Sequence, residues 1–174
     1  MQRYCKLINE ETGEVQLGVG CSDKFYQAIG MTKENVEQSE VDGLWYLSKK
    51  CPSFTKAEKL ENAKNEKLVE NDLLRDEKLN SGILYNDILF DSDMDQKINI
   101  LATLSTMADE DTITWYGMNN DGLLCTKQDL LAIGNAIKEL HIYCWNKNAR
   151  LKDAINSART INSLNKIEVN YNDI

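Results

Sequence analysis

The apolar repeat between Leu130 and Ala158 constrains the fold of this chain more than any other feature. Its positions recur in steps that alternate three and four residues, and only Lys147 interrupts the apolar set. The remaining members are Leu130, Ile133, Ile137, Leu140, Cys144, Leu151, Ala154 and Ala158. An average step of about 3.5 residues is typical of a helix that packs lengthwise on another helix. The repeat therefore predicts a long helix with a long partner helix, either in the same chain or in another subunit.

Both ends of this helix can be predicted. Thr126 precedes the repeat and Asp129 follows three residues later, a pairing that satisfies free amides at a helix N-terminus. No glycine follows Gly134 and no later proline interrupts the pattern. We therefore expect the helix to continue to about Ser157, a length of roughly 45 Å at 1.5 Å per residue.

The charge of the chain excludes several classes of partner. The 174 residues carry a formal net charge of −8, with no basic patch of the kind that binds phosphate groups. We therefore expect neither nucleic acid nor an anionic membrane as a partner. No stretch approaches the roughly 18 apolar residues that span a bilayer, and the first residues lack the apolar core of a secretion signal. This predicts a protein that is made in the cytoplasm.

The pattern along the chain predicts an α+β protein in three segments. Residues 1–51 form a small β-rich module, with hairpin turns near Gly13 and at Asp42-Gly43 and a short helix capped by Ser22. Trp45 and Tyr46 are its candidate contact residues, although a plain core role is favoured for them. Residues 52–81 form a charged spacer helix that opens with a capping box at Thr55–Glu58, and the alternative is a coiled-coil helix between subunits.

Residues 82–174 form the third segment, an α+β module that contains the long helix. We expect a short β-element after Gly82, then a helix capped by Asp93, then a hairpin around residues 119–122. The capped helix is expected to pack through Ile98, Leu101, Leu104, Ser105 and Ala108. The five cysteines lack any C-x-x-C pair, which predicts small buried residues. They are Cys5, Cys21, Cys51, Cys125 and Cys144.

A search for reaction chemistry yields no catalytic residue, no cofactor site and no metal site. The single histidine, His141, lies next to the apolar repeat, where a flanking structural role is favoured over a pH-responsive contact. The acidic run that begins at Asp91 resembles a calcium loop only at its start. Its sixth and twelfth positions are Gln96 and Ala102, where such a loop needs glycine and glutamate. An enzyme that uses the scattered acidic residues is therefore the least favoured class.

Several short motifs, taken together from about Gly82 to Val169, resemble a family. Their positions are residues 89–93 before a helix, 113–115 leading into 119–122, 124–126 before the long helix, and 151–158 followed by Thr160. They resemble a domain of uncharacterised function in tail-fibre, fibre-assembly and other small tail proteins of tailed bacteriophages. The resemblance implies no catalytic residue.

The resemblance implies a function in particle assembly. The leading hypothesis is a non-enzymatic component of a phage tail or tail-like particle, at the baseplate or tail fibre. Its partners would be other tail, baseplate or fibre proteins and further copies of itself. It would lie in the cytoplasm of the bacterial host during assembly and then in the virion tail. The alternative is a tail-fibre assembly chaperone that leaves before the particle is complete.

Overall fold

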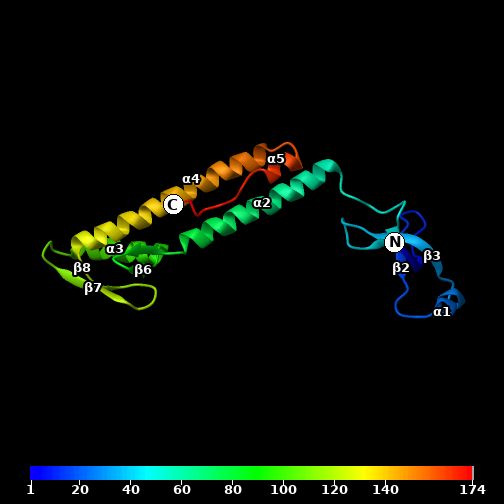
Figure 1. Ribbon diagram of the computed structural model, residues 1–174, viewed down its shortest axis with the longest axis horizontal. Helices are drawn as coiled ribbons and strands as arrows, with labels where there is room; N and C mark the ends of the chain where they lie inside the picture. Colours follow the sequence, from blue (N-terminus) through cyan, green and yellow to red (C-terminus); the bar gives the residue numbers. More distant parts are fainter. Residues whose placement is uncertain (174) are drawn as a thin grey trace. The chain divides into compact units, whose positions relative to one another are not determined.

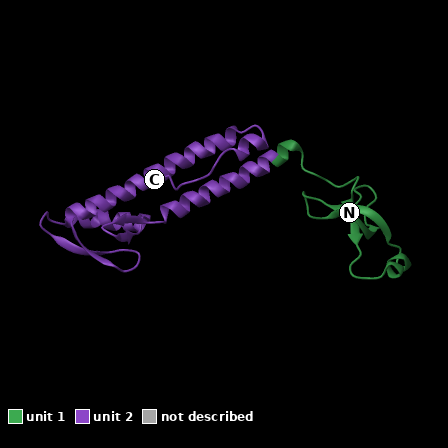
Figure 2. Ribbon diagram, viewed as in Figure 1, with its two compact units in different colours: residues 1–59 green, residues 60–174 purple. Residues whose placement is uncertain are grey.

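The computed structural model describes residues 1–173 and divides the chain into two compact units. They are Met1–Lys59 and Leu60–Ile174 (Figure 2). Both units contain helices and strands, so the predicted α+β class is confirmed. We refer to them as unit 1 and unit 2.

Unit 1 is built on an antiparallel sheet in the order β2-β1-β3-β4. Its strands are β1 Gln2–Leu7, β2 Val15–Leu17, β3 Thr32–Gln38 and β4 Trp45–Leu47. The two predicted hairpins are confirmed, and glycines with positive φ lie in both turns, Gly13 and Gly43. The sheet curls, because the amide of Leu47 donates to the carbonyl of Gly13 at 2.9 Å. Its core is Cys5, Val15 and Val36.

Helix α1, Asp23–Ala28, follows β2 and contacts β1 through Tyr26. Its predicted cap is confirmed, since Ser22 accepts a hydrogen bond from the amide of Phe25. The ring of Tyr26 is buried and stacks on Tyr4, with 5.0 Å between ring centroids. The Tyr26 hydroxyl also accepts from the amide of Cys21 at 2.8 Å.

The predicted capping box at Thr55 opens helix α2, Lys56–Leu79. The amide of Thr55 donates to the Glu58 carboxylate at 2.8 Å, and the Thr55 hydroxyl accepts from the amide of Glu58 at 3.2 Å. From Leu60 onward α2 belongs to unit 2, where it lies alongside α4, Lys127–Ser157 (Figure 1). The helix expected to be a spacer therefore packs along α4, and the long partner helix comes from the same chain.

The two helices run antiparallel. Lys64 near the start of α2 donates to the carbonyl of Asn156 near the end of α4 at 2.8 Å. At the other end Leu79 packs in one cluster with Leu140. The α4 cap is confirmed as a capping box formed by Thr126 and Asp129, and the helix continues to Ser157 as predicted.

Short elements between α2 and α4 complete one end of unit 2 (Figure 1). They are β5 Ile83–Tyr85, β6 Ile88–Phe90, α3 Met94–Thr106, β7 Thr112–Tyr116 and β8 Gly122–Thr126. Strands β5 and β6 form one hairpin, and β7 and β8 form another. They enclose a core with α3 and the first half of α4: Phe90, Ile100, Met107, Cys125, Leu130, Ile133 and Ile137. After α4, helix α5, Ile161–Asn165, precedes a C-terminal segment, residues 166–173.

Helix α3 differs from its prediction in the face that it buries. The cap at Asp93 is confirmed, but the buried residue is Ile100, whereas Ile98 and Leu101 are 55% and 60% exposed. The helix also ends at Thr106, before Ala108. Of the expected stripe, Leu104 is partly buried and packs against the core.

The cysteines divide between core and surface. Cys5, Cys125 and Cys144 are buried as predicted, Cys51 is partly buried and Cys21 is exposed. All are free thiols. Within residues 1–173 no helix is both long and apolar enough to cross a bilayer.

Candidate functional site

The predicted apolar stripe of α4 is the starting point for the site. Its first part, from Leu130 to Ile137, is fully buried in the core shared with α3 and the hairpins. Leu140 and Cys144 are buried in a cluster with residues of α2 and the C-terminal segment. Further on, Ala158 is buried, Leu151 is partly buried and Ala154 is exposed.

The stripe shifts by one residue after Cys144. Asn148, at 3% exposure, occupies the buried position expected for residue 147, and Ile155, at 0%, replaces Ala154. This shift keeps the ammonium group of Lys147 outside the helix contact. It also brings a larger apolar side chain against α2, because Ile155 packs in a cluster that includes Leu60.

A buried polar cluster lies where α2 meets α4. The side-chain amide of Asn71, which is fully buried, donates to the backbone carbonyl of Asn148 at 3.3 Å. The carbonyl oxygen of the Asn71 side chain accepts from the Tyr171 hydroxyl at 2.8 Å. The Asn148 side chain donates to Asp72 at 3.0 Å. A buried amide in a helix contact specifies register, because any sliding leaves it without partners.

Asp72 forms ion pairs with two basic side chains at the edge of this cluster. The same carboxylate oxygen accepts from Lys152 of α4 and from Arg75 of α2, each at 2.8 Å. The hydrogen bond from Lys152 is the main cause that lowers the pKa of Asp72. The Arg75 guanidinium also lies over the Trp145 ring, 4.8 Å from its centroid. These contacts tie α2 to α4 beside the buried amides.

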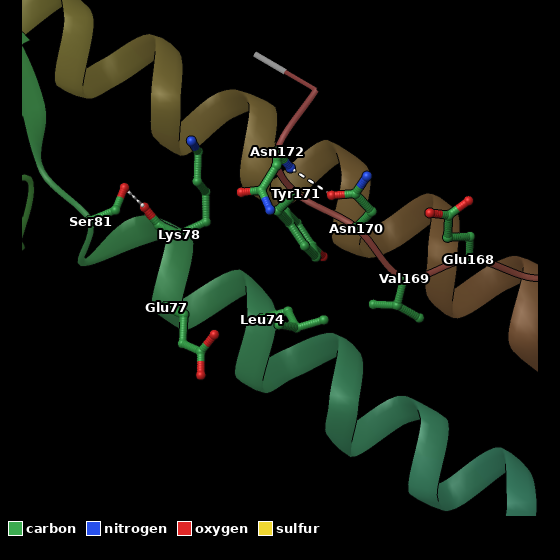
Figure 3. Close-up of a pocket in the computed structure, with 9 residues that line it drawn as sticks. All are labelled: Leu74, Glu77, Lys78, Ser81, Glu168, Val169, Asn170, Tyr171 and Asn172. Carbon is green, nitrogen blue, oxygen red and sulfur yellow. Dashed lines mark hydrogen bonds between the residues drawn. The ribbon is translucent and has the colours of Figure 1, made fainter.

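The C-terminal segment lies along the α2–α4 pair. In Figure 3 the segment crosses the ribbon of α4, and the Tyr171 ring points toward the gap between α4 and α2. Tyr171 is 3% exposed, and its ring packs edge-on against that of Tyr143, with 6.5 Å between the ring centroids. A cavity of about 350 Å³ remains beside it. Its lining comprises Leu74, Glu77, Lys78, Ser81, Glu168, Val169, Asn170, Tyr171 and Asn172.

Asp173, at the end of the C-terminal segment, binds polar side chains of α4. The Asp173 carboxylate accepts from the Lys147 ammonium group and from the Tyr143 hydroxyl. The hydrogen bond from Lys147 is the main cause that lowers the pKa of Asp173 to about 2. Lys147, which interrupts the apolar repeat in the sequence, therefore anchors the C-terminal segment.

This anchor predicts a pH-dependent stability. Because the pKa of Asp173 is lower in the folded chain, its carboxylate stabilises the fold above pH about 4, its ordinary value, and loses that effect as pH falls toward 2. The melting temperature of the native protein should therefore exceed that of Asp173→Asn at pH 5, and the difference should shrink between pH 4 and 2. Thermal melts across this range check it. A difference that stays constant to pH 2 would contradict the anchor.

The two candidate contact residues of unit 1, Trp45 and Tyr46, differ in solvent exposure. Tyr46 is 6% exposed, and its hydroxyl donates to Asp42 at 2.7 Å. That hydrogen bond is the main cause that raises the Tyr46 pKa to about 12. Trp45 is partly buried, with the Arg3 guanidinium 5.1 Å from its ring centroid. Tyr46 thus serves the fold, and only Trp45 keeps accessible surface.

Two further titratable residues, His141 and Asp129, also form structural contacts. Nε2 of His141, which is partly buried, lies 2.7 Å from the backbone carbonyl of Ser92, so the ring links α4 to the start of α3. The Asp129 carboxylate caps α4 and accepts from the Tyr85 hydroxyl at 2.7 Å. In the described part of the chain no cluster of His, Cys, Asp and Glu could hold a metal ion. The chemistry available at the α2–α4 contact is recognition by packing and hydrogen bonding.

Sequence reasoning did not predict Asn71, Asn148 or Tyr171. An asparagine at a buried position of a helix contact breaks the apolar pattern, so periodicity alone treats it as a surface residue. The available signal was the pair of asparagines on the two long helices, each at a position where an apolar residue would complete the stripe.

Comparison with known proteins places unit 2 in a family. No curated protein and no solved structure matches the chain. A family model described as a domain of unknown function, DUF4376, matches residues 62–172, more than half of the chain. The match begins inside α2, earlier than the resemblance seen from Gly82, and includes both long helices and the C-terminal segment. The chain therefore belongs to the DUF4376 family.

Proposed function

We propose that this protein is a non-enzymatic structural component of a phage tail or tail-like particle, associated with the baseplate or tail fibre. It acts through protein–protein contacts with other tail, baseplate or fibre proteins and with further copies of itself. The resemblance of the motifs between Gly82 and Val169 to small tail proteins supports this setting. It would assemble in the cytoplasm of a bacterial host and remain in the virion tail.

The observation that carries the contact role is the exposed apolar surface of unit 2. Met94, Ile98 and Leu101 on α3 are 57%, 55% and 60% exposed. On α4, Ile142 and Trp145 are 51% and 54% exposed. Clustered apolar side chains on the surface of a folded unit mark interaction sites in soluble proteins. The α2–α4 contact supplies the stiff support that such a surface needs.

Mass spectrometry of purified particles tests this proposal. The protein should be found in particles washed at high salt, at a constant ratio to other tail proteins. Detection on free fibre protein but not on complete particles would favour the alternative, an assembly chaperone. Absence from both fractions, while the chain is present in the producing cells, would overturn both. A particle-free lysate fraction carried through the same purification controls for adsorption.

A further inference from the structure

A groove lies between α3 and α4 on unit 2. It has a volume of about 150 Å³ and an apolar floor and walls, with an ammonium group on each helix. Its lining comprises Lys97, Ile100, Leu101, Leu104, Leu131, Gly134, Asn135 and Lys138. We call it the α3–α4 groove.

Gly134 keeps the floor of the groove open. A Cβ atom at this position would lie 3.3 Å from Cγ2 of Ile100, closer than ordinary van der Waals contact. The missing side chain lets α3 approach α4 and leaves a recess above Ile100. An apolar side chain from a partner helix could fill such a recess, as in other helix-in-groove contacts.

The exposed apolar residues extend the groove along both helices. On α3 Met94, Ile98 and Leu101 recur in steps of four and three, so they lie on one side of the helix. Ile142 lies four residues after Lys138, and therefore on the same side of α4. The surface is thus long enough to meet a helix, and its two groove lysines make it basic in a chain of net charge −8.

The outer face of α2 has the complementary character. Val69 and Leu73 lie one turn apart and are each 59% exposed. Glutamates flank them, and all are exposed: Glu66, Glu70 and Glu77. Within the described residues none of these glutamates forms an ion pair, and neither do Lys97 and Lys138. Opposite charges flank apolar residues on both surfaces.

We propose that the α3–α4 groove binds the outer face of α2 from a second copy of this chain. Val69 and Leu73 would enter the apolar groove, while the flanking glutamates would meet Lys97 and Lys138. Because the two surfaces differ, the contact joins copies either reciprocally in a pair or head to tail. The inference rests on the proposed function, to which it adds the contact that joins the copies.

Charge reversal on each surface gives the first part of the test. Variant A carries Lys97→Glu and Lys138→Glu, and variant B carries Glu66→Lys and Glu70→Lys. Light scattering over a concentration series should show self-association of the native chain. In either variant the dissociation constant should rise by about tenfold or more, because like charges then face each other. Unchanged thermal melts would show that both variants fold.

Mixing the variants gives the second part. The native groove of variant B faces the native α2 of variant A, and the two reversed surfaces also have opposite charges. The mixture should therefore associate although neither variant does so alone. A matched control, Lys6→Glu with Lys24→Glu, reverses two exposed lysines in unit 1 and should associate like the native chain. Light scattering of the 1:1 mixture measures this.

The outcomes separate this inference from the proposed function. A native chain that stays monomeric at all concentrations, or a mixture that fails to associate, would overturn the contact even if the protein is found in particles. Self-association that survives both reversals would also overturn it, since another surface would then be responsible. A chain that passes both parts but is absent from particles would retain this contact and lose the tail role.

Discussion

Replacement of Ile155 by aspartate is expected to lower the free energy of unfolding of unit 2 by about 4 kcal/mol. Ile155 is fully buried and packs with Ala158 and Leu164 at the end of the α2–α4 contact. The substitution removes buried apolar surface and places a carboxylate among apolar side chains. Urea denaturation followed by circular dichroism measures the loss.

Ala154→Asp is the matched control for this prediction. The apolar repeat treats residue 154 as part of the stripe, but the structure exposes it. The same new side chain one residue away should therefore cost less than about 1 kcal/mol, mostly through the lower helix propensity of aspartate. Equal losses in the two variants would contradict the register described for α4 beyond Cys144.

Replacement of Tyr171 by alanine is the second large effect expected, about 3 to 5 kcal/mol. The ring fills the space between α2 and α4, and its hydroxyl is the donor to the Asn71 side chain. The variant would leave a cavity and a buried amide oxygen without its partner. Urea denaturation measures the stability, and limited proteolysis should show faster cleavage in residues 166–173.

Tyr171→Phe separates the two causes. It keeps the ring and removes only the hydrogen bond to Asn71, so a loss of about 1 to 2 kcal/mol is expected. Proteolysis of the C-terminal segment should then stay close to that of the native chain. A native-like stability of Tyr171→Ala would show that the segment does not contribute to the fold.

Local signals in the sequence predicted the elements of this fold well. Both hairpins of unit 1 and the caps at Ser22, Thr55, Asp93 and Thr126 are confirmed. These features depend on a few neighbouring residues whose preferences are strong: glycine where φ is positive, and hydroxyl or carboxylate groups beside free amides. Long-range packing does not alter them.

The identity of the buried residues was harder to predict where it depends on contacts with residues far away in the sequence. Asn148 is buried in place of Lys147, and its hydrogen-bond partners Asn71 and Asp72 lie far away in the sequence. Ile100 is buried in place of Ile98 and Leu101, and it packs against Gly134, which has no side chain. The packing of α2 was also not predicted, because its contact face includes the polar Asn71 and its leucines form only an uneven apolar stripe.

Each unit contains at least one buried thiol, so the rate of thiol alkylation can measure transient unfolding of each unit separately. Burial raises the pKa of the Cys5 thiol in unit 1 and of the Cys125 and Cys144 thiols in unit 2, which further limits their reactivity while the chain is folded. An alkylating reagent would therefore modify the exposed Cys21 at once and the buried thiols only during transient unfolding. The local stability of the sheet and of the paired helices can thus be timed separately in the native sequence, without any introduced label.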